Sequence, residues 1–267
     1  MKRILSLVAG VLAALGLVLG TASTALASVG PQFFSPEQAG YAATGAHFKY
    51  VQTSVKLPDA SQFATNVAGF GFSVQLRTKF RVVVLGLSNT TTPGDYSAAV
   101  AVFNRTTHSL ICSTASASKP CPNVPSGWTS GKVSFPPGDT VFLVAQYRRA
   151  IGVDQFFVSD QTSGVQLFYG GYAPGTGKLY RQARVGAEFA ADPFSTFSYT
   201  PPSTETHLVT FKNCVLITYG GSISSFTSSW TRHKVITTSD GTSTGTVEVR
   251  PHSLFNFGQN FGVFLEP

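Results

Sequence analysis

The sequence predicts an all-β protein built as a two-sheet antiparallel β-sandwich. Short runs rich in Val, Phe, Tyr and Thr recur along the chain, and turn formers such as Pro93-Gly94-Asp95 and Pro137-Gly138-Asp139 separate them. No segment after residue 27 has apolar residues at the 3.6-residue period of an amphipathic helix. Charged residues make up only 12% of the chain, which favours broad sheets with Ser- and Thr-rich outer faces. Many short strands at regular spacing are typical of two packed antiparallel sheets.

The strand pattern runs from residue 46 to the C-terminus without an internal repeat or a long linker, so we expect a single domain over residues 46–267. The segment from Val141 to Ala145 is nearly all apolar, as expected for a central strand buried on both faces. In order along the chain, the expected strands are residues 48–57, 68–76, 81–87, 97–103, 141–148, 155–158, 165–169, 179–191, 207–219, 228–237, 244–249 and 254–265.

The first 27 residues have the pattern of a secretory signal peptide. Lys2-Arg3 precedes an apolar run over residues 4–20, and Ala25-Leu26-Ala27 matches the small-x-small sequence that signal peptidase recognises. A stop-transfer helix is the alternative, but the run has the length of a signal core, and no second apolar stretch of about 18 residues follows. We therefore expect a secreted, extracellular protein with no integral membrane segment after cleavage, and residues 28–45 as its lead-in.

The charge of the expected mature chain is mildly basic. Its 240 residues carry 17 basic and 12 acidic side chains, a formal charge of +5. Such a charge suits an anionic cell-wall polymer, although simple solubility is the favoured explanation. Arg77, Lys79 and Arg81 alternate, which predicts a basic stripe on one strand face; such stripes are usually solvated, and anion binding is the less common interpretation. We expect a monomer whose partner is an extracellular polymer or polypeptide, and no binding of nucleic acid.

The three cysteines agree with an oxidising compartment. Cys112 and Cys121 lie on either side of a loop that contains Lys119-Pro120, and a disulfide between them would close a short ring worth about 2 to 3 kcal/mol. Cys214 is then unpaired. Because it stands in an apolar strand, a buried and inert thiol is favoured over a reactive nucleophile.

Most catalytic signatures are missing from the sequence. There is no His-Glu-x-x-His, Cys-x-x-Cys or Gly-x-Ser-x-Gly, and the five histidines fall in five separate segments, so we predict no metal and no cofactor. Two carboxylates differ from the acidic residues in turns, because Glu188 and Asp192 lie within an apolar segment. Four residues apart on a strand, they would share a face at a separation of about 13 Å, too far to share a proton.

At these residues the sequence resembles the glutamic peptidases, or eqolisins. The resemblance lies in Ala187-Glu-Phe-Ala-Ala-Asp192, in Val209-Thr-Phe-Lys-Asn-Cys214, in Thr53-Ser-Val-Lys-Leu-Pro58 and in Gly138-Asp139. It implies a concanavalin-like jelly roll and an acid endopeptidase site. In that family a Glu acts as general base on a water, and a Gln amide helps to hold the tetrahedral oxyanion.

The family's catalytic pair is not intact when the motifs are aligned. The family Glu falls on Asp192, which is one methylene shorter, and the Gln falls on Gly86 if Phe72 takes the position of a family Trp. Losing an oxyanion donor costs about 10² to 10³ in turnover, and misplacing the base adds a similar loss. Two alternatives stay open: Gln75 supplies an amide from a neighbouring position, or the alignment shifts and Glu188 becomes the base.

Three functions are compatible with these observations, and the missing catalytic pair favours the first over the second. The first is a non-catalytic or strongly diverged binder of an extracellular glycan or peptide, which uses exposed aromatic and Arg side chains. The second is an acid glutamic-type endopeptidase with Asp192 or Glu188 as base and Gln75 as amide donor. The third is a structural protein of the cell surface that lacks a discrete groove. For the first function the candidate ligand-binding residues are Phe72, Tyr169, Tyr172, Tyr180 and Arg181.

Overall fold

The structure is a computed structural model of the 267-residue chain. It describes residues 32–35, 38–58, 70–89, 96–107, 109–128, 133–172, 179–189, 209–226, 231–238, 243–244 and 247–265. The predicted signal peptide lies outside these ranges, and so does Asp192. In the described part of the chain no helix has the length and apolar character needed to cross a membrane.

Seventeen strands and one short 3₁₀ helix make up the described chain. The 3₁₀ helix, η2, is Ser126–Trp128. The strands are β1 (Phe33–Ser35), β2 (Gln38–Thr44), β3 (Phe48–Lys56), β4 (Phe70–Arg77), β5 (Arg81–Asn89), β6 (Tyr96–Asn104), β7 (Leu110–Ser113), β8 (Ser134–Phe135), β9 (Thr140–Arg148), β10 (Val153–Asp160), β11 (Gln166–Tyr172), β12 (Gln182–Phe189), β13 (Val209–Thr218), β14 (Ile223–Ser224), β15 (Thr231–Thr238), β16 (Val247–Pro251) and β17 (Phe261–Leu265).

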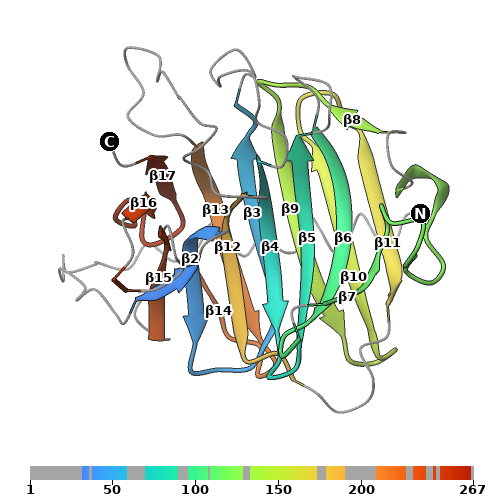
Figure 1. The fold of residues 1–267 in the computed structure, drawn as a ribbon, viewed down its shortest axis with the longest axis horizontal. Helices are drawn as coiled ribbons and strands as arrows, with labels where there is room; N and C mark the ends of the chain where they lie inside the picture. Colours follow the sequence, from blue (N-terminus) through green and yellow to red (C-terminus); the bar gives the residue numbers. More distant parts are fainter. Residues whose placement is uncertain are drawn as a thin grey trace.

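These strands form two sheets packed face to face, which confirms the predicted β-sandwich (Figure 1). The first sheet has the order β1–β15–β2–β12–β4–β5–β6, with β7 and β8 both beside β6. The second has the order β11–β10–β9–β3–β13–β17–β16, with β14 beside β13. All pairs are antiparallel except β1–β15, and the pairing of β15 with β16 joins the two sheets at one edge.

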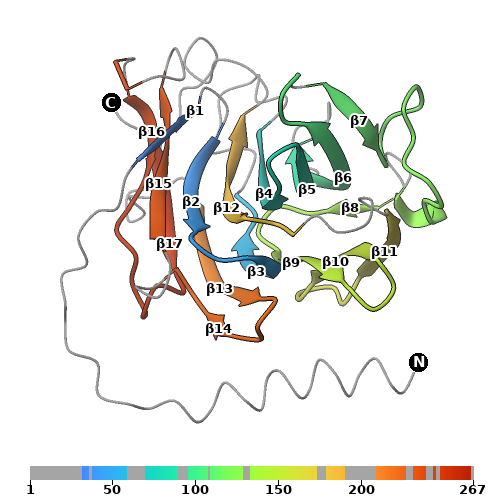
Figure 2. The same ribbon diagram turned by 90° about the horizontal axis from the view of Figure 1, so that it is seen from below.

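The first sheet bends along its width. Figure 2 shows its margins, β1 on one side and β7 on the other, turned away from the second sheet, so that the outer face lies on the inside of the bend. The inner face carries alternate residues of each strand, as the two-residue period of a strand requires. Phe72, Val74 and Leu76 of β4 are examples, each at most 1% exposed.

Aromatic rings connect the two sheets in the core. The ring of Phe72 in β4 lies 6.0 Å from that of Phe211 in β13, and Phe211 stacks on Phe261 of β17 at 4.8 Å. Tyr41 of β2 meets Phe261 edge to face at 5.0 Å. Burial of each such ring contributes about 1.5 to 3 kcal/mol, so these contacts fix how the sheets face each other.

The folded part of the chain begins earlier than residue 46. Strands β1 and β2 fall within residues 28–45, where the sequence analysis expected only a lead-in, and β2 pairs with both β12 and β15. The segment was missed because Gln-Ala-Gly-Tyr-Ala-Ala-Thr contains few residues of high β propensity. Its place in the sheet is set by tertiary pairing.

The prediction of a basic stripe over residues 77–81 is wrong. A turn separates Arg77, the last residue of β4, from Arg81, the first of β5, and the Thr78 side chain accepts hydrogen bonds from the backbone of Phe80 and Arg81. Because Arg77 pairs with Val82 across this hairpin, the three basic side chains do not share a strand face. Arg77 alone joins the polar residues on the outer face.

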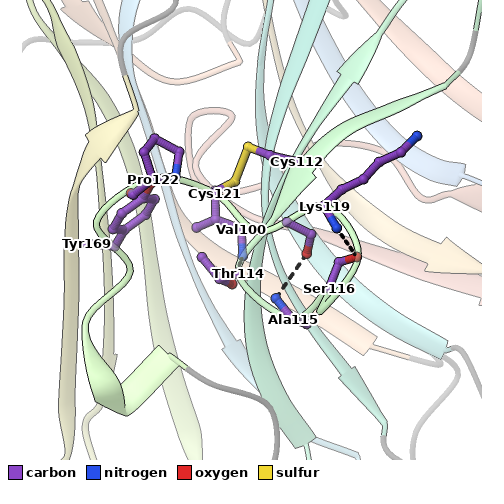
Figure 3. Close-up of a disulfide and its surroundings, with 10 residues drawn as sticks. Val100, Cys112, Thr114, Ala115, Ser116, Lys119, Cys121, Pro122 and Tyr169 are labelled. Carbon is purple, nitrogen blue, oxygen red and sulfur yellow. Dashed lines mark hydrogen bonds between the residues drawn. A yellow bond between two sulfur atoms is a disulfide. The ribbon is translucent and has the colours of Figure 1, made fainter.

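The predicted disulfide between Cys112 and Cys121 is present, and Cys214 is free and buried as expected. Figure 3 shows the bridge beside a compact loop. In this loop Ser113 N–H donates to the Lys119 carbonyl at 2.8 Å. The Tyr169 hydroxyl of β11 donates to the Pro122 carbonyl at 2.7 Å. The bridged loop therefore connects the β7 margin of the first sheet to the second sheet.

Removing the bridge with Cys112→Ser and Cys121→Ser together is expected to lower the free energy of unfolding by about 2 to 3 kcal/mol. The reason is the lost constraint on the unfolded chain, since the two cysteines are nine residues apart. Chemical denaturation checks this, with reduction of the wild-type protein as the matched comparison. Equal stability of the oxidised wild type and the double variant would contradict it.

A buried carboxyl, that of Asp154 in β10, lies in the core. Asp154 is 1% exposed, and its Oδ2 accepts a hydrogen bond from the Tyr180 hydroxyl at 2.6 Å, while its Oδ1 is buried without a partner. Burial raises the pKa of Asp154 to about 7, and the bond from Tyr180 opposes that rise only in part. Asp154 is therefore neutral in the acidic range.

We predict that this carboxyl makes the fold more stable in acid. The folded state binds a proton that the unfolded state releases above its ordinary value of 3.8, so stability falls between about pH 4 and pH 7 by roughly 4 kcal/mol. Asp154→Asn keeps an acceptor for Tyr180 and should remove that slope. Urea unfolding at a series of pH values measures it, and an identical slope in wild type and variant would contradict the prediction.

Candidate active site

The outer face of the first sheet carries a group of polar side chains above the middle strands. Along β4 the outward residues are Ser73, Gln75 and Arg77, and along β12 they are Gln182, Arg184 and Glu188, with Gly186 between the last two. The register places Gly186 opposite Ser73, Arg184 opposite Gln75 and, on the other side of β12, Glu188 opposite Gln38 of β2. Period-two alternation in three adjacent strands therefore gathers these side chains on one face.

The carboxylate of Glu188 lies at the centre of this group. Its Oε1 accepts hydrogen bonds from Gln38 Nε2 at 2.9 Å, from the Ser73 hydroxyl and from Gln75 Nε2. Gln38, Ser73 and Gln75 are all buried, whereas the side chain of Glu188 is partly exposed. Among the described residues no donor bonds Oε2, so the hydrogen bonds of this carboxylate fall on one oxygen.

Two arginines hold the glutamine amides. Arg77 Nε donates to Gln75 Oε1 at 2.7 Å, and one terminal nitrogen of Arg184 donates to Gln38 Oε1 at 2.9 Å. Because each amide oxygen is engaged by a guanidinium, each amide nitrogen must face Glu188. The orientation of both glutamines is thus set by their partners.

Opposing effects act on the ionisation of Glu188. Burial raises the pKa of its carboxyl, while the hydrogen bond from Ser73, the charge of Arg77, the hydrogen bond from Gln75 and the charge of Arg184 lower it. The pKa of Arg77 falls only to about 10, so this arginine stays charged in neutral and acidic solution. The net direction for Glu188 is upward, towards the range in which a carboxylate accepts a proton readily.

Glycines border the carboxylate on both sides. Ser73 pairs with Gly186 on one side and with Gly86 on the other, and Glu188 pairs with Gly71. A Cβ at Gly186 would lie 2.4 Å from the Ala39 carbonyl oxygen, because β2 and β12 approach closely there. At Gly86 the nearest atom would be the Phe72 carbonyl oxygen at an ordinary 3.5 Å. Glycines therefore stand beside Glu188 at position 186 of its own strand and at position 71 of β4.

The arrangement can perform proton transfer next to an amide donor. A carboxylate with one unengaged oxygen can take a proton from a water, and an amide N–H beside it can stabilise negative charge on a neighbouring oxygen. Among the described residues no group of three or more His, Cys, Asp or Glu side chains could hold a metal ion.

Comparison with solved structures places this geometry in a known architecture. Scytalido-glutamic peptidase bound to a transition state analog inhibitor superposes with a TM-score of 0.59 at 13% identity, covering 87% of this chain and 100% of that one. The fold is that of the glutamic peptidases. SCP-B, a member of the eqolisin family in complex with the tripeptide Ala-Ile-His, gives a TM-score of 0.51 at 12% identity and the same coverage. No protein-family model and no curated protein matches the chain.

The structure brings together two of the residues that the glutamic-peptidase resemblance had left as alternatives, Gln75 and Glu188. Gly86, where the aligned family Gln falls, pairs with Ser73 on the outer face, so Gln75 presents an amide one strand away from the position that lacks one. Asp192 lies outside the described residues.

Three of the predicted ligand-binding residues have aromatic rings that are buried in the core. Phe72, Tyr169 and Tyr180 are each 0% exposed, so their rings belong to the core and offer no surface to a ligand. Strand alternation turns Phe72 and Tyr169 inward, where exposed rings were expected, and Tyr180 forms an isolated bridge with Phe48 and donates its hydroxyl to Asp154. Arg181 is exposed, and the side chain of Tyr172 lies outside the described part.

Four residues of the site were not found from the sequence: Gln38, Ser73, Arg77 as a site residue, and Arg184. The signal for three of them is the alternation Ser-Val-Gln-Leu-Arg in β4 and Gln-Ala-Arg-Val-Gly-Ala-Glu in β12, where every second residue is polar or glycine. Gln38 has no such signal, because it starts a strand that was not expected.

The glycine next to the carboxylate provides a test of the β2–β12 contact. Gly186→Ala is expected to lower the free energy of unfolding by about 1 to 3 kcal/mol, since its methyl group would meet the Ala39 backbone. The matched control Gly86→Ala sits in the same row, where a methyl group would make only ordinary van der Waals contacts, and should change stability by less than about 1 kcal/mol. Thermal unfolding compares them, and an equal effect of both would contradict the contact.

Proposed function

We propose that the protein is a secreted acid endopeptidase of the glutamic type, in which Glu188 is the general base and Gln75 the amide donor. The observation that carries the proposal is the hydrogen bond from Gln75 Nε2 to Glu188 Oε1, with no described donor on Oε2. The glutamic-peptidase fold supports it, as does the disulfide, which fits an oxidising compartment.

The proposed reaction begins with a water bound at Glu188 Oε2. Glu188 takes one proton from this water as its oxygen attacks the carbonyl carbon of the peptide bond, and the carbonyl oxygen becomes an oxyanion. Gln75 Nε2 also donates to Ser73 Oγ at 3.2 Å, and we assign this second N–H to the oxyanion, which would replace the Ser73 hydroxyl as its acceptor while the amide stays in place. Protonated Glu188 then delivers the proton to the leaving nitrogen, the C–N bond breaks, and the carboxylate is regenerated.

The pH dependence follows from the ionisation of Glu188. Only the ionised carboxylate can act as base, and burial raises its pKa while Arg77 and Arg184 oppose that rise. Activity should therefore increase as pH rises through the pKa of Glu188. The core around Asp154 is most stable in acidic solution, which is compatible with peptidase activity at acidic pH.

Cleavage of a denatured protein substrate in the acidic range, by the mature chain, tests the proposal. Glu188→Gln should reduce kcat by at least about 10³-fold, and Gln75→Ala by about 10² to 10³-fold, through loss of one oxyanion donor. Asp192→Asn distinguishes the two candidate bases, and should leave most of the activity.

Two results would contradict the proposal. Loss of activity in Asp192→Asn with retention in Glu188→Gln would assign the base to Asp192. No cleavage by the wild-type protein at any acidic pH would favour the other hypothesis, a non-catalytic binder of an extracellular polymer. Salt-sensitive retention on cell-wall preparations is the observation expected in that case.

A further inference from the structure

We propose that Arg77 and Arg184 are positioning residues of the site, each holding one glutamine so that its amide N–H groups point at Glu188. The effect on catalysis rests on the proposed function, whereas the orientation of the two amides towards the Glu188 carboxylate does not depend on it. Neither arginine is a ligand of the substrate in this assignment. They act through Gln75 and Gln38.

The first pair is Arg77 and Gln75, neighbours on the outer face of β4. Arg77 Nε donates to Gln75 Oε1 at 2.7 Å, within the range of a good hydrogen bond, and Gln75 is 2% exposed. A glutamine amide can turn by 180° and exchange its oxygen and nitrogen. With its oxygen held by a cation, the turned form would place N–H against N–H and oxygen against the Glu188 carboxylate, so it is excluded.

The second pair repeats the arrangement from the other side of Glu188. Arg184 donates to Gln38 Oε1 at 2.9 Å, and Gln38 Nε2 donates to Glu188 Oε1 at 2.9 Å. Arg184 is itself fixed by a hydrogen bond from its Nε to Gln182 Oε1 at 3.2 Å, and its guanidinium lies 5.3 Å from the centre of the Phe33 ring. Arg77 also reaches Gln38 Oε1, at 3.4 Å, which links the two pairs.

The charges around Glu188 come from few groups. The side chains that face Glu188 come from three strands: Ser73, Gln75 and Arg77 from β4, Gln38 from β2 and Arg184 from β12. Among the described residues, Glu188 is the one carboxylate in this group. The charge of Arg105 lowers the pKa of Arg77 and of Arg184, and its guanidinium donates to the Thr78 carbonyl. Arg77 and Arg184 therefore combine two effects, orientation of the amides and electrostatic stabilisation of the ionised form.

A purely structural role predicts something different from a positioning role. Buried arginines that only satisfy hydrogen bonds would, when replaced, lower stability and leave the folded protein with normal kcat and normal ionisation of Glu188. A positioning residue changes kcat more than KM, and shifts the acidic limb of the pH profile. Substitutions that separate charge from geometry can distinguish the roles.

The activity arm of the experiment uses Arg77→Met, Arg77→Lys and the control Arg105→Met. Arg77→Met should lower kcat by about 10-fold to 100-fold with KM little changed, since a misdirected amide misplaces a donor by about an ångström. Arg77→Lys keeps the charge without the planar fork, and should recover the acidic limb but only part of kcat. Arg105→Met removes a nearby charge that touches neither amide, and should behave like wild type.

The ionisation arm does not depend on activity. The chain contains five glutamates, so glutamate labelled with ¹³C at the carboxyl carbon gives five signals, and Glu188→Gln identifies the one of interest. Arg77→Met should raise the pKa of Glu188 by about 1, and Arg105→Met should leave it unchanged. Arg184→Lys tests the second pair: a lysine cannot reproduce the guanidinium bond to Gln38 Oε1, and burial disfavours a charged amine at this position, so the pKa of Glu188 should rise.

Each outcome decides the inference. A raised pKa of Glu188 in Arg77→Met, with a wild-type value in Arg105→Met, supports it even if the wild-type protein cleaves nothing, in which case only the proposed function fails. Wild-type kcat and an unchanged pKa of Glu188 in both Arg77→Met and Arg184→Lys, with the variants folded by circular dichroism, would overturn it.

Discussion

The negative charge of Glu188 on a closely packed sheet is the constraint to which the surrounding residues respond. A carboxylate that loses water must recover its hydrogen bonds from the protein or take up a proton. Gln38, Ser73 and Gln75 converge on a single oxygen of Glu188, and Arg77 and Arg184 lie behind the two glutamines. All three donors bond the same oxygen, Oε1, and no described donor bonds Oε2, the oxygen to which we assign the proton transfer.

The carboxyls of Asp154 and Glu188 have different surroundings, although burial raises the pKa of both. Asp154 has a single donor, the Tyr180 hydroxyl, and an unpartnered second oxygen, so burial dominates and the neutral form is favoured up to about pH 7. Glu188 has three donors and two cations, which oppose the effect of burial. The two environments differ in the number of donors and cations around the carboxyl, which is the kind of difference that separates the roles of two acids in one fold.

Local sequence patterns predicted the fold better than they predicted the site. Strands such as β3, β5 and β9 were expected because their apolar residues and flanking turns lie within a few residues of each other, and the Cys112–Cys121 bridge closes a short loop. The site depends on contacts between distant segments. Glu188 meets Gln38 across 150 residues and Gln75 across 113, and β2 has weak strand propensity of its own. The buried rings of Tyr169 and Tyr180 show the same limit, since composition does not tell which face of a strand is covered.

A crystal structure of the mature protein with a peptide transition-state analogue, in the acidic range, tests the central claim most directly. The account predicts that the tetrahedral centre of the analogue binds on the outer face of the first sheet, with one oxygen at Glu188 Oε2 and the other within hydrogen-bond reach of Gln75 Nε2. An analogue bound elsewhere, or a Gln75 amide turned away from Glu188 in the complex, would contradict it.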